Sequence, residues 1–175
     1  QKGFTLIELL VVIAVIGVLS GIILSALGSA RAKSRDSLRA QQLLQLKNAL
    51  EMYALDHDGR YPVVTGTQYY SSEPLLGAPA NVDASTNGGD WIPGLMPTYI
   101  ASLPVWPKAL FLASPPTCLT NGYPGGYLYR SAGDGYWLLA HCGPESQVSS
   151  TSALYDSNRP TWAWKVCSGQ TYCSQ

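Results

Sequence analysis

The sequence predicts an α+β protein in which one long N-terminal helix carries a small antiparallel β-sheet on its C-terminal half. Three observations lead to this prediction. Apolar residues recur at helical spacing and no proline occurs before Pro62. Apolar and polar residues alternate with the period of a strand after residue 126. The segment between is rich in Pro, Gly, Ser and Asn, which is typical of loop.

The helix begins with an apolar half, residues 4–28. From Phe4 to Leu27 the one charged residue is Glu8. At about 1.5 Å per residue this run is about 36 Å long, enough to cross a bilayer. A carboxylate inside such a run costs roughly 2.5–3.5 kcal/mol on insertion scales. Glu8 is therefore a functional candidate that requires a partner.

An amphipathic half, residues 29–58, follows the apolar half. The helix should end near residues 56–59, because Gly59 is a common stop signal. From Thr5 to Asp56 such a helix is about 78 Å long, and no small domain can cover both of its ends. Its first half must therefore be buried by lipid or by other subunits. The apolar stripe expected to face the sheet comprises Leu38, Leu43, Leu44, Leu46, Leu50, Met52 and Tyr53.

Gly17 and Gly21 form a small-xxx-small pair, which lets helices approach closely. They have two interpretations. One is simple tolerance in a membrane helix. The other is a point of helix flexibility during assembly, since glycine costs about 1 kcal/mol against alanine in a helix interior.

Charge gives little indication of a partner. The chain has eleven basic and eleven acidic side chains, so we expect no nucleic acid partner. Residues 31–39 are locally basic, with Arg31, Lys33, Arg35 and Arg39 against Asp36.

Residues 59–126 are expected to be a connecting loop, and residues 127–175 the sheet and the cysteine-bearing region. The expected strands are 127–131, 136–142 and 161–167, with a hairpin turn at 132–135. Three antiparallel strands with an apolar face can pack on a helix. We expect Trp137 and Trp164 to fill the core between sheet and helix. Trp91 and Trp106 are expected to lie in the loop, where packing constrains them less.

The four cysteines are Cys118, Cys142, Cys167 and Cys173. An even number beyond a membrane segment predicts disulfides in an oxidising compartment. Three pairings are possible, and we favour Cys118–Cys142 with Cys167–Cys173. No pair has the Cys-x2-4-Cys spacing of a zinc site.

The stretch Gly3-Phe4-Thr5-Leu6-Ile7-Glu8 resembles the processing site of type IV pilins and type II secretion pseudopilins. The resemblance implies that a prepilin peptidase cuts after Gly3, that residues 1–3 are residual leader and that Phe4 becomes a methylated N-terminus. It implies that Glu8 faces the N-terminal amine of a neighbouring subunit, and that the fold is the pilin-like ladle. An ordinary signal peptide has a shorter apolar core and an Ala-x-Ala-like cut site.

Two places depart from the family pattern. Many members carry a helix-breaking proline shortly after the glycine region, whereas residues 24–26 are Leu, Ser and Ala. Many also have Pro-x-Asp-Pro before the sheet, where this chain has Pro104-Val105-Trp106-Pro107. Some pseudopilins bind calcium near the C-terminus, and Asp134 and Asp156 are the candidates here. No dense Asp-x-Asp run is present, so no cofactor is expected.

The expected function is that of a structural subunit, without catalysis, of an extracellular type IV pilus-like filament. The first alternative is a type II secretion pseudopilin in a periplasmic pseudopilus. The second is a membrane-anchored extracytoplasmic binding or enzyme domain, although His57 and His141 have no marked catalytic partners. The implied partners are like subunits, the peptidase, an inner-membrane assembly platform and, before assembly, membrane lipid. The implied locations are the inner membrane and then the cell surface.

Overall fold

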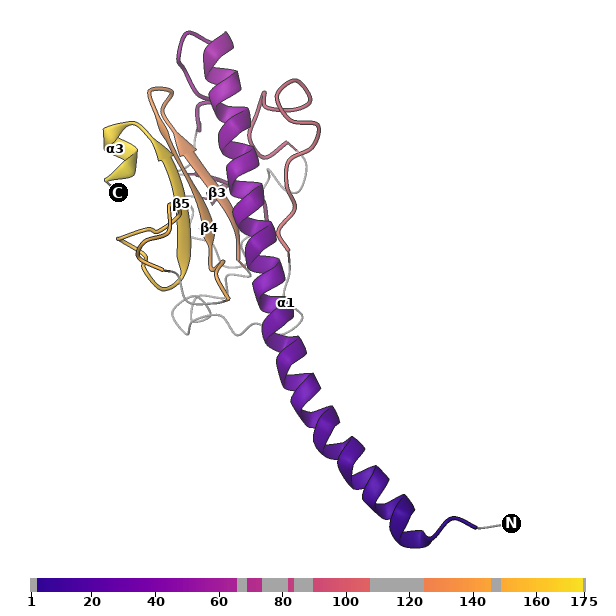
Figure 1. The fold of residues 1–175 in the computed structure, drawn as a ribbon. Coiled ribbons are helices and arrows are strands. Elements are labelled where there is room, and N and C mark those ends of the chain that lie inside the picture. Colours follow the sequence, from indigo (N-terminus) through magenta and orange to yellow (C-terminus); the bar gives the residue numbers. More distant parts are fainter. Residues whose placement is uncertain are drawn as a thin grey trace.

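The computed structural model describes residues 3–65, 69–73, 82–83, 90–107, 125–145 and 149–174, without the side chains of 24–26 and 82–83. One long helix, α1 (Leu6–Asp56), runs the length of the molecule, and a β-sheet packs against its C-terminal half (Figure 1). The predicted α+β fold, a long helix with a small and mainly antiparallel sheet, is confirmed.

The end of α1 lies where the sequence predicts it, at Asp56. The next turn is closed by the Gly59 N–H, which donates to the Ala54 carbonyl at 2.8 Å. Asp58 and Gly59 have φ of 53° and 76°, the left-handed region that glycine adopts without steric cost. The chain therefore reverses sharply after the helix and returns toward the sheet.

The sheet has five strands in the order β2-β1-β3-β4-β5. The bounds are β1 Tyr69–Ser71, β2 Val82–Asp83, β3 Gly126–Ser131, β4 Tyr136–His141 and β5 Ala163–Ser168, followed by the short helix α3, Gln170–Cys173. The last three strands are the three expected from the sequence, and they pair antiparallel. β1 adds antiparallel to β3, and β2 adds parallel to β1. The sequence pattern predicted two strands too few, because β1 and β2 lie in the segment that was expected to be loop.

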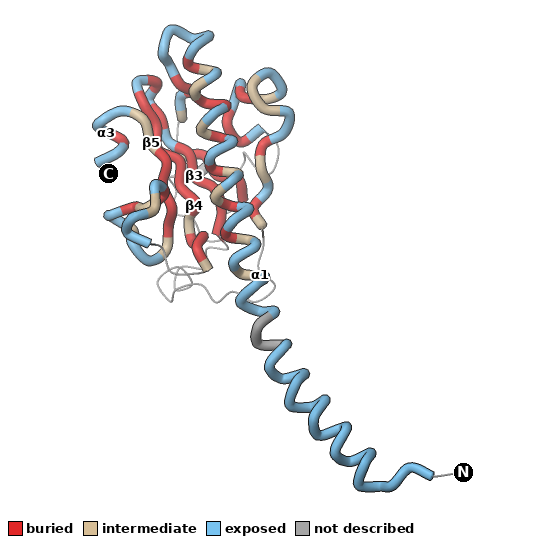
Figure 2. The backbone as a smooth tube through the Cα atoms, in the orientation of Figure 1, coloured by how far each residue is buried: buried red, intermediate tan, exposed pale blue. Residues whose placement is uncertain are grey.

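The helix touches the sheet along a narrow face. Leu43, Leu46 and Leu50 are fully buried, and α1 packs on β4 and β5. Figure 2 shows that burial is confined to this half of the molecule. Leu38, Leu44 and Met52 are instead 44%, 47% and 52% exposed, so the predicted stripe was too wide. Mixed three- and four-residue steps extend around the helix beyond the line that a sheet can cover.

The loop tryptophans are buried, contrary to the prediction. Trp91 is 1% exposed and Trp106 3%. The Trp91 ring stacks on Tyr127 with centroids 6.2 Å apart, and Trp106 meets the same ring edge-on at 5.0 Å. These rings attach the segment 90–107 to β3, which makes that segment part of the core.

The two strand tryptophans lie on opposite faces of the sheet. Trp164 belongs to the core that faces α1, as predicted. Trp137 lies in a second apolar cluster with Leu139 and Tyr172, so its assignment to the helix-facing core was wrong. The α3 helix contributes Tyr172 to this second cluster, and the sheet is therefore buried on both faces.

Where α1 enters the domain lies a largely buried group of charges that we call the Arg39 cluster (Arg35, Asp36 and Arg39 of the helix, with Glu145). Arg39 is 1% exposed, and its Nη1 lies 2.9 Å from Asp36 Oδ1 and 2.6 Å from Glu145 Oε1. Arg35 binds both carboxylate oxygens of Glu145. Burial opposes ionisation of Glu145, but the hydrogen bonds from the two arginines hold the pKa of this carboxyl below its ordinary value.

The same guanidinium also binds the loops at the end of the sheet. Arg39 Nη1 donates to the Gly143 carbonyl at 2.8 Å, and Nη2 donates to the Pro107 carbonyl at 2.6 Å. Its Cζ lies 4.6 Å from the centre of the Trp106 ring, a cation–π contact. Two loops far apart in sequence are thereby tied to one turn of α1.

We predict that Arg39→Met destabilises the full-length protein by about 3–5 kcal/mol, because Asp36 and Glu145 then keep buried charges with too few cations. Arg35→Met is the matched control. The Arg35 side chain is 25% exposed, so its loss should cost roughly 1 kcal/mol. Denaturant unfolding in mild detergent measures both variants. Equal losses would show that burial of Arg39 has no special weight.

Candidate assembly site

The N-terminus of α1 is closed by a capping box between Thr5 and Glu8. Thr5 is the N-cap, and its Oγ1 accepts a hydrogen bond from the Glu8 N–H at 3.3 Å. Glu8 Oε2 in turn accepts from the Thr5 N–H at 2.8 Å and from the Thr5 hydroxyl at 2.7 Å. Two otherwise unpaired groups at the start of the helix are satisfied reciprocally. The helix therefore begins at Leu6, two residues after Phe4, the expected first residue of the mature protein.

The capping box gives the Glu8 carboxylate hydrogen-bond partners but does not neutralise its negative charge. Both donors from Thr5 are neutral groups. An ionised carboxylate in an apolar environment needs an opposite charge as well as hydrogen bonds. The geometry keeps the carboxylate at the tip of the helix, beside Phe4, which is 82% exposed. A positive group arriving from another molecule can reach it there.

Within the part of the chain that the structure describes, nothing covers the apolar half of α1. The described side chains from Phe4 to Ile23, and Leu27, are exposed (Figure 2). The helix is long and apolar enough to cross a membrane, and none of its most apolar 18-residue stretch is buried. Soluble monomers rarely expose an apolar surface of this extent. Lipid or another protein must therefore cover it.

Gly17 and Gly21 lie within one uninterrupted helix. Apart from the helix's own nearby backbone and the adjoining residues, no described atom lies within 4 Å of the position that a Cβ would take at either residue, so close contacts do not require glycine here. Beside them is an apolar hollow of about 290 Å³, lined by Ala14, Val15, Val18 and Leu19. The proposed flexibility of these glycines stays a prediction.

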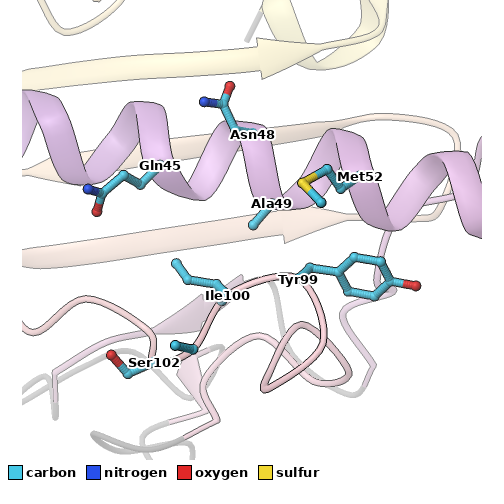
Figure 3. Close-up of a pocket in the computed structure, with 8 residues that line it drawn as sticks. Gln45, Asn48, Ala49, Met52, Tyr99, Ile100 and Ser102 are labelled. Atoms are coloured by element: carbon cyan, nitrogen blue, oxygen red, sulfur yellow. The ribbon is translucent and has the colours of Figure 1, made fainter.

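A shallow groove of about 410 Å³ lies between α1 and the loop that follows residue 98 (Figure 3). Ala49 on the helix points toward Tyr99 and Ile100 of the loop. The groove is uncharged, and its full lining is Gln45, Asn48, Ala49, Met52, Tyr99, Ile100, Ala101 and Ser102. Sequence reasoning did not identify it, because it depends on where the loop packs.

The two histidines have structural surroundings. His57 Nδ1 lies 2.8 Å from the Tyr53 carbonyl oxygen, and its ring stacks on the Tyr53 ring at 3.8 Å. Burial, and secondarily the positive charge of Arg159, lower the pKa of His141 to about 4. His141 is therefore neutral at physiological pH, and its ring packs edge-on against Trp162 at 5.0 Å.

Cys167 and Cys173 form a disulfide with Cα atoms 5.3 Å apart, the pair favoured from the sequence. This bond joins the end of β5 to α3. Cys118 lies outside the described residues, so its pairing with Cys142 stays a prediction.

The two calcium candidates have different environments. Asp134 is exposed in the β3–β4 turn, where its Oδ1 accepts a hydrogen bond from the Tyr172 hydroxyl at 3.4 Å. Asp156 is fully buried and is ion-paired with Arg159 and Lys165. In the described part of the chain, no three His, Cys, Asp or Glu side chains gather closely enough to hold a metal ion. The residues around Asp156 therefore do not fit a calcium site, because two cations already compensate its charge.

Comparison with known proteins places this arrangement in a family. Residues 1–24 match the model of the prokaryotic N-terminal methylation motif. The chain is 33% identical over 135 residues to the type II secretion system core protein G of Escherichia coli (strain K12), covering 76% of this chain and 81% of that protein. It is 39% identical over 62 residues to the protein of the same name from Aeromonas hydrophila, covering 35% of this chain and 43% of that protein.

A pilus protein is also similar. The type IV wide pilus major component PilA4 of Thermus thermophilus is 36% identical over 84 residues, which cover 48% of this chain and 62% of that protein. No solved structure matches the chain. The processing motif, the exposed apolar helix and the similarity to protein G over three quarters of the sequence agree. The chain belongs to the type IV pilin and type II secretion pseudopilin family, and it is a structural subunit of the pilin or pseudopilin kind.

Proposed function

We propose that this chain polymerises through α1 into an extracellular type IV pilus-like filament, in which it acts as a structural and not a catalytic subunit. The observation that carries the proposal is the apolar half of α1. All of its described side chains are exposed, on a protein whose other half is well packed. A surface of this kind has two possible covers, the hydrocarbon of a bilayer and the same surface of other subunits.

Both covers are used in succession. Before assembly the apolar half lies in the inner membrane, with the sheet domain outside, where disulfides such as Cys167–Cys173 are stable. An assembly platform in the membrane then moves the subunit into the filament. There the apolar halves form the core of the filament and the sheet domains form its outer wall. The filament lies outside the cell, at the cell surface.

The groove between α1 and the loop supports close packing of neighbouring subunits. Its lining has no charged side chain, so a neighbour that enters it desolvates no charge. Met52 is 52% exposed in the isolated chain and supplies apolar area to such a contact. The groove and the apolar half both involve α1, so this one helix can contact neighbouring subunits at more than one position along its length.

A pseudopilus is the second candidate, favoured by the protein G of Escherichia coli, whose similarity extends over 81% of that protein. The pilus protein of Thermus thermophilus favours the first candidate over a shorter alignment. Both assignments use the same subunit surfaces and differ in where the filament ends. A membrane-anchored monomer with a binding or catalytic domain is the remaining alternative.

We predict that subunits from assembled filaments begin at Phe4 and carry a methyl group on its nitrogen. The cut creates a free amine next to the capping box, at the same end of the helix as Glu8. Intact-mass and N-terminal peptide spectrometry of native material measure both modifications. A native chain that begins at or before Gly3 would contradict processing by a prepilin peptidase.

We predict that Glu8→Gln and Glu8→Val both insert in the membrane and are cleaved, but yield at least tenfold less filament than the wild type. Losing one member of a buried ion pair costs about 3–5 kcal/mol, because the neighbour's amine stays unpaired. Glutamine preserves the capping box, whereas valine does not, so the pair separates charge from helix capping. Membrane-held and sheared protein are quantified separately. Normal filament yield from Glu8→Gln would show that the charge is not used for docking.

We predict that shearing releases long filaments from cells, which electron microscopy and immunoblotting of the sheared fraction detect. Subunits that crosslink as a ladder but stay in the cell envelope would indicate the pseudopilus instead. A subunit that stays monomeric in the membrane would contradict both forms of the proposal and favour an anchored domain.

A further inference from the structure

Lys165 on β5 is a buried lysine that plays no part in assembly as described above. The residue is 8% exposed, and the carboxylate that it faces, Asp156, is fully buried. Lysine and aspartate are rarely buried to this degree unless they are paired. A buried pair contributes little to stability compared with apolar residues of similar size, so its geometry suggests a more specific role.

The ammonium lies between two kinds of oxygen. Lys165 Nζ is 3.3 Å from Asp156 Oδ1 and donates to the Cys173 carbonyl at 3.1 Å. Carboxylate and backbone carbonyl oxygens are also the ligands that a calcium ion takes from proteins. The site thus offers oxygens of the kind that hold a hard cation, and a lysine side chain fills it.

This one ammonium joins three segments of the chain. Asp156 belongs to the loop before β5, Lys165 to β5 itself and Cys173 to α3. The Lys165 N–H also donates to the Leu154 carbonyl at 2.9 Å, which holds the loop along the strand. The Cys167–Cys173 disulfide closes α3 onto the end of β5. The disulfide fixes α3 to β5 but does not reach the loop before β5. The ammonium contacts both α3 and that loop, so it holds all three segments together.

Among the described residues, the charged side chains around Asp156 disfavour the binding of a further cation. Arg159 Nη1 lies 2.9 Å from Asp156 Oδ2, so one carboxylate faces two positive side chains. A divalent ion that approached would meet like charges at close range. The Asn158 N–H donates to Asp156 Oδ1 at 3.1 Å and occupies a further lone pair.

We propose that Lys165 is an internal cation that orders the C-terminal loop, β5 and α3 in the way a bound divalent ion would, and that the subunit therefore folds without calcium. A covalently attached cation cannot be removed by chelation or dilution. The outer wall of the filament then keeps its shape in media of any calcium content.

The first test measures the thermal unfolding of full-length wild-type protein in mild detergent, in a chelator (EDTA) and in millimolar calcium chloride. The proposal expects the same Tm in both, within about 2 °C. A Tm that falls in the chelator or rises with calcium would show a bound divalent ion and overturn it. This outcome is independent of filament assembly, because it concerns the unassembled subunit.

The second test compares two cations on the same carboxylate. Lys165→Met should lower the Tm by roughly 6–12 °C, since it removes a buried partner. Arg159→Met is the matched control and should lower it by less than about 4 °C, because the Arg159 side chain is 27% exposed. Equal shifts would overturn the proposal.

If Lys165→Met does not fold, Lys165→Met combined with Asp156→Leu keeps the question open to measurement. Removing both members of a buried pair relieves the unpaired charge, so the double variant should fold and recover at least half of the lost Tm. A double variant that is no better than the single one would show that Lys165 acts by filling space, and the internal-cation role would fail.

Discussion

The length of α1 relative to the sheet is the constraint on which the rest of the structure depends. Its 51 residues give a rod of about 77 Å, whereas six-residue strands span about 20 Å. A sheet of this size cannot cover the whole rod, so the first half of α1 stays exposed whatever the sequence of the domain. Insertion in a bilayer and polymerisation are two ways of meeting this one requirement, and a subunit that can do both is able to move from membrane to filament without refolding.

The boundary between the exposed and covered halves is held by ionic contacts. Arg39 binds Asp36 on its own helix, Glu145 after β4 and the backbone of two loops. Apolar packing tolerates small rotations, but a guanidinium held by several acceptors has one favourable geometry. Any error in the angle between the rod and the domain is repeated at every subunit of a filament. A buried charged cluster at this boundary therefore suits a protein that must present its domain in one orientation.

The features predicted from the sequence are those that depend on local patterns. The processing motif is itself a short run of residues. The end of α1 near Gly59 and the three main strands lie within a few residues of the sequence patterns that predict them. The side of the sheet taken by Trp137 was not predictable, because the first five residues of β4 are all buried and no alternation distinguishes the two faces. Arg39 reads as a surface charge until Glu145, far along the chain, is placed beside it. β1 and β2 are too short to show a period.

Four carboxylates of the chain differ in where their counter-charge comes from. Asp36, Glu145 and Asp156 lie in the domain and are paired with arginine or lysine of the same chain. Glu8, in the apolar half, is held by neutral donors from Thr5. The charges of these three carboxylates are thus compensated within the chain, which lets the domain fold before assembly. In the proposed filament, the counter-charge of Glu8 comes from a neighbouring subunit, so the free energy of neutralising this carboxylate becomes available when that subunit docks. Under this proposal, the carboxylate that makes the membrane-bound state unfavourable favours the filament.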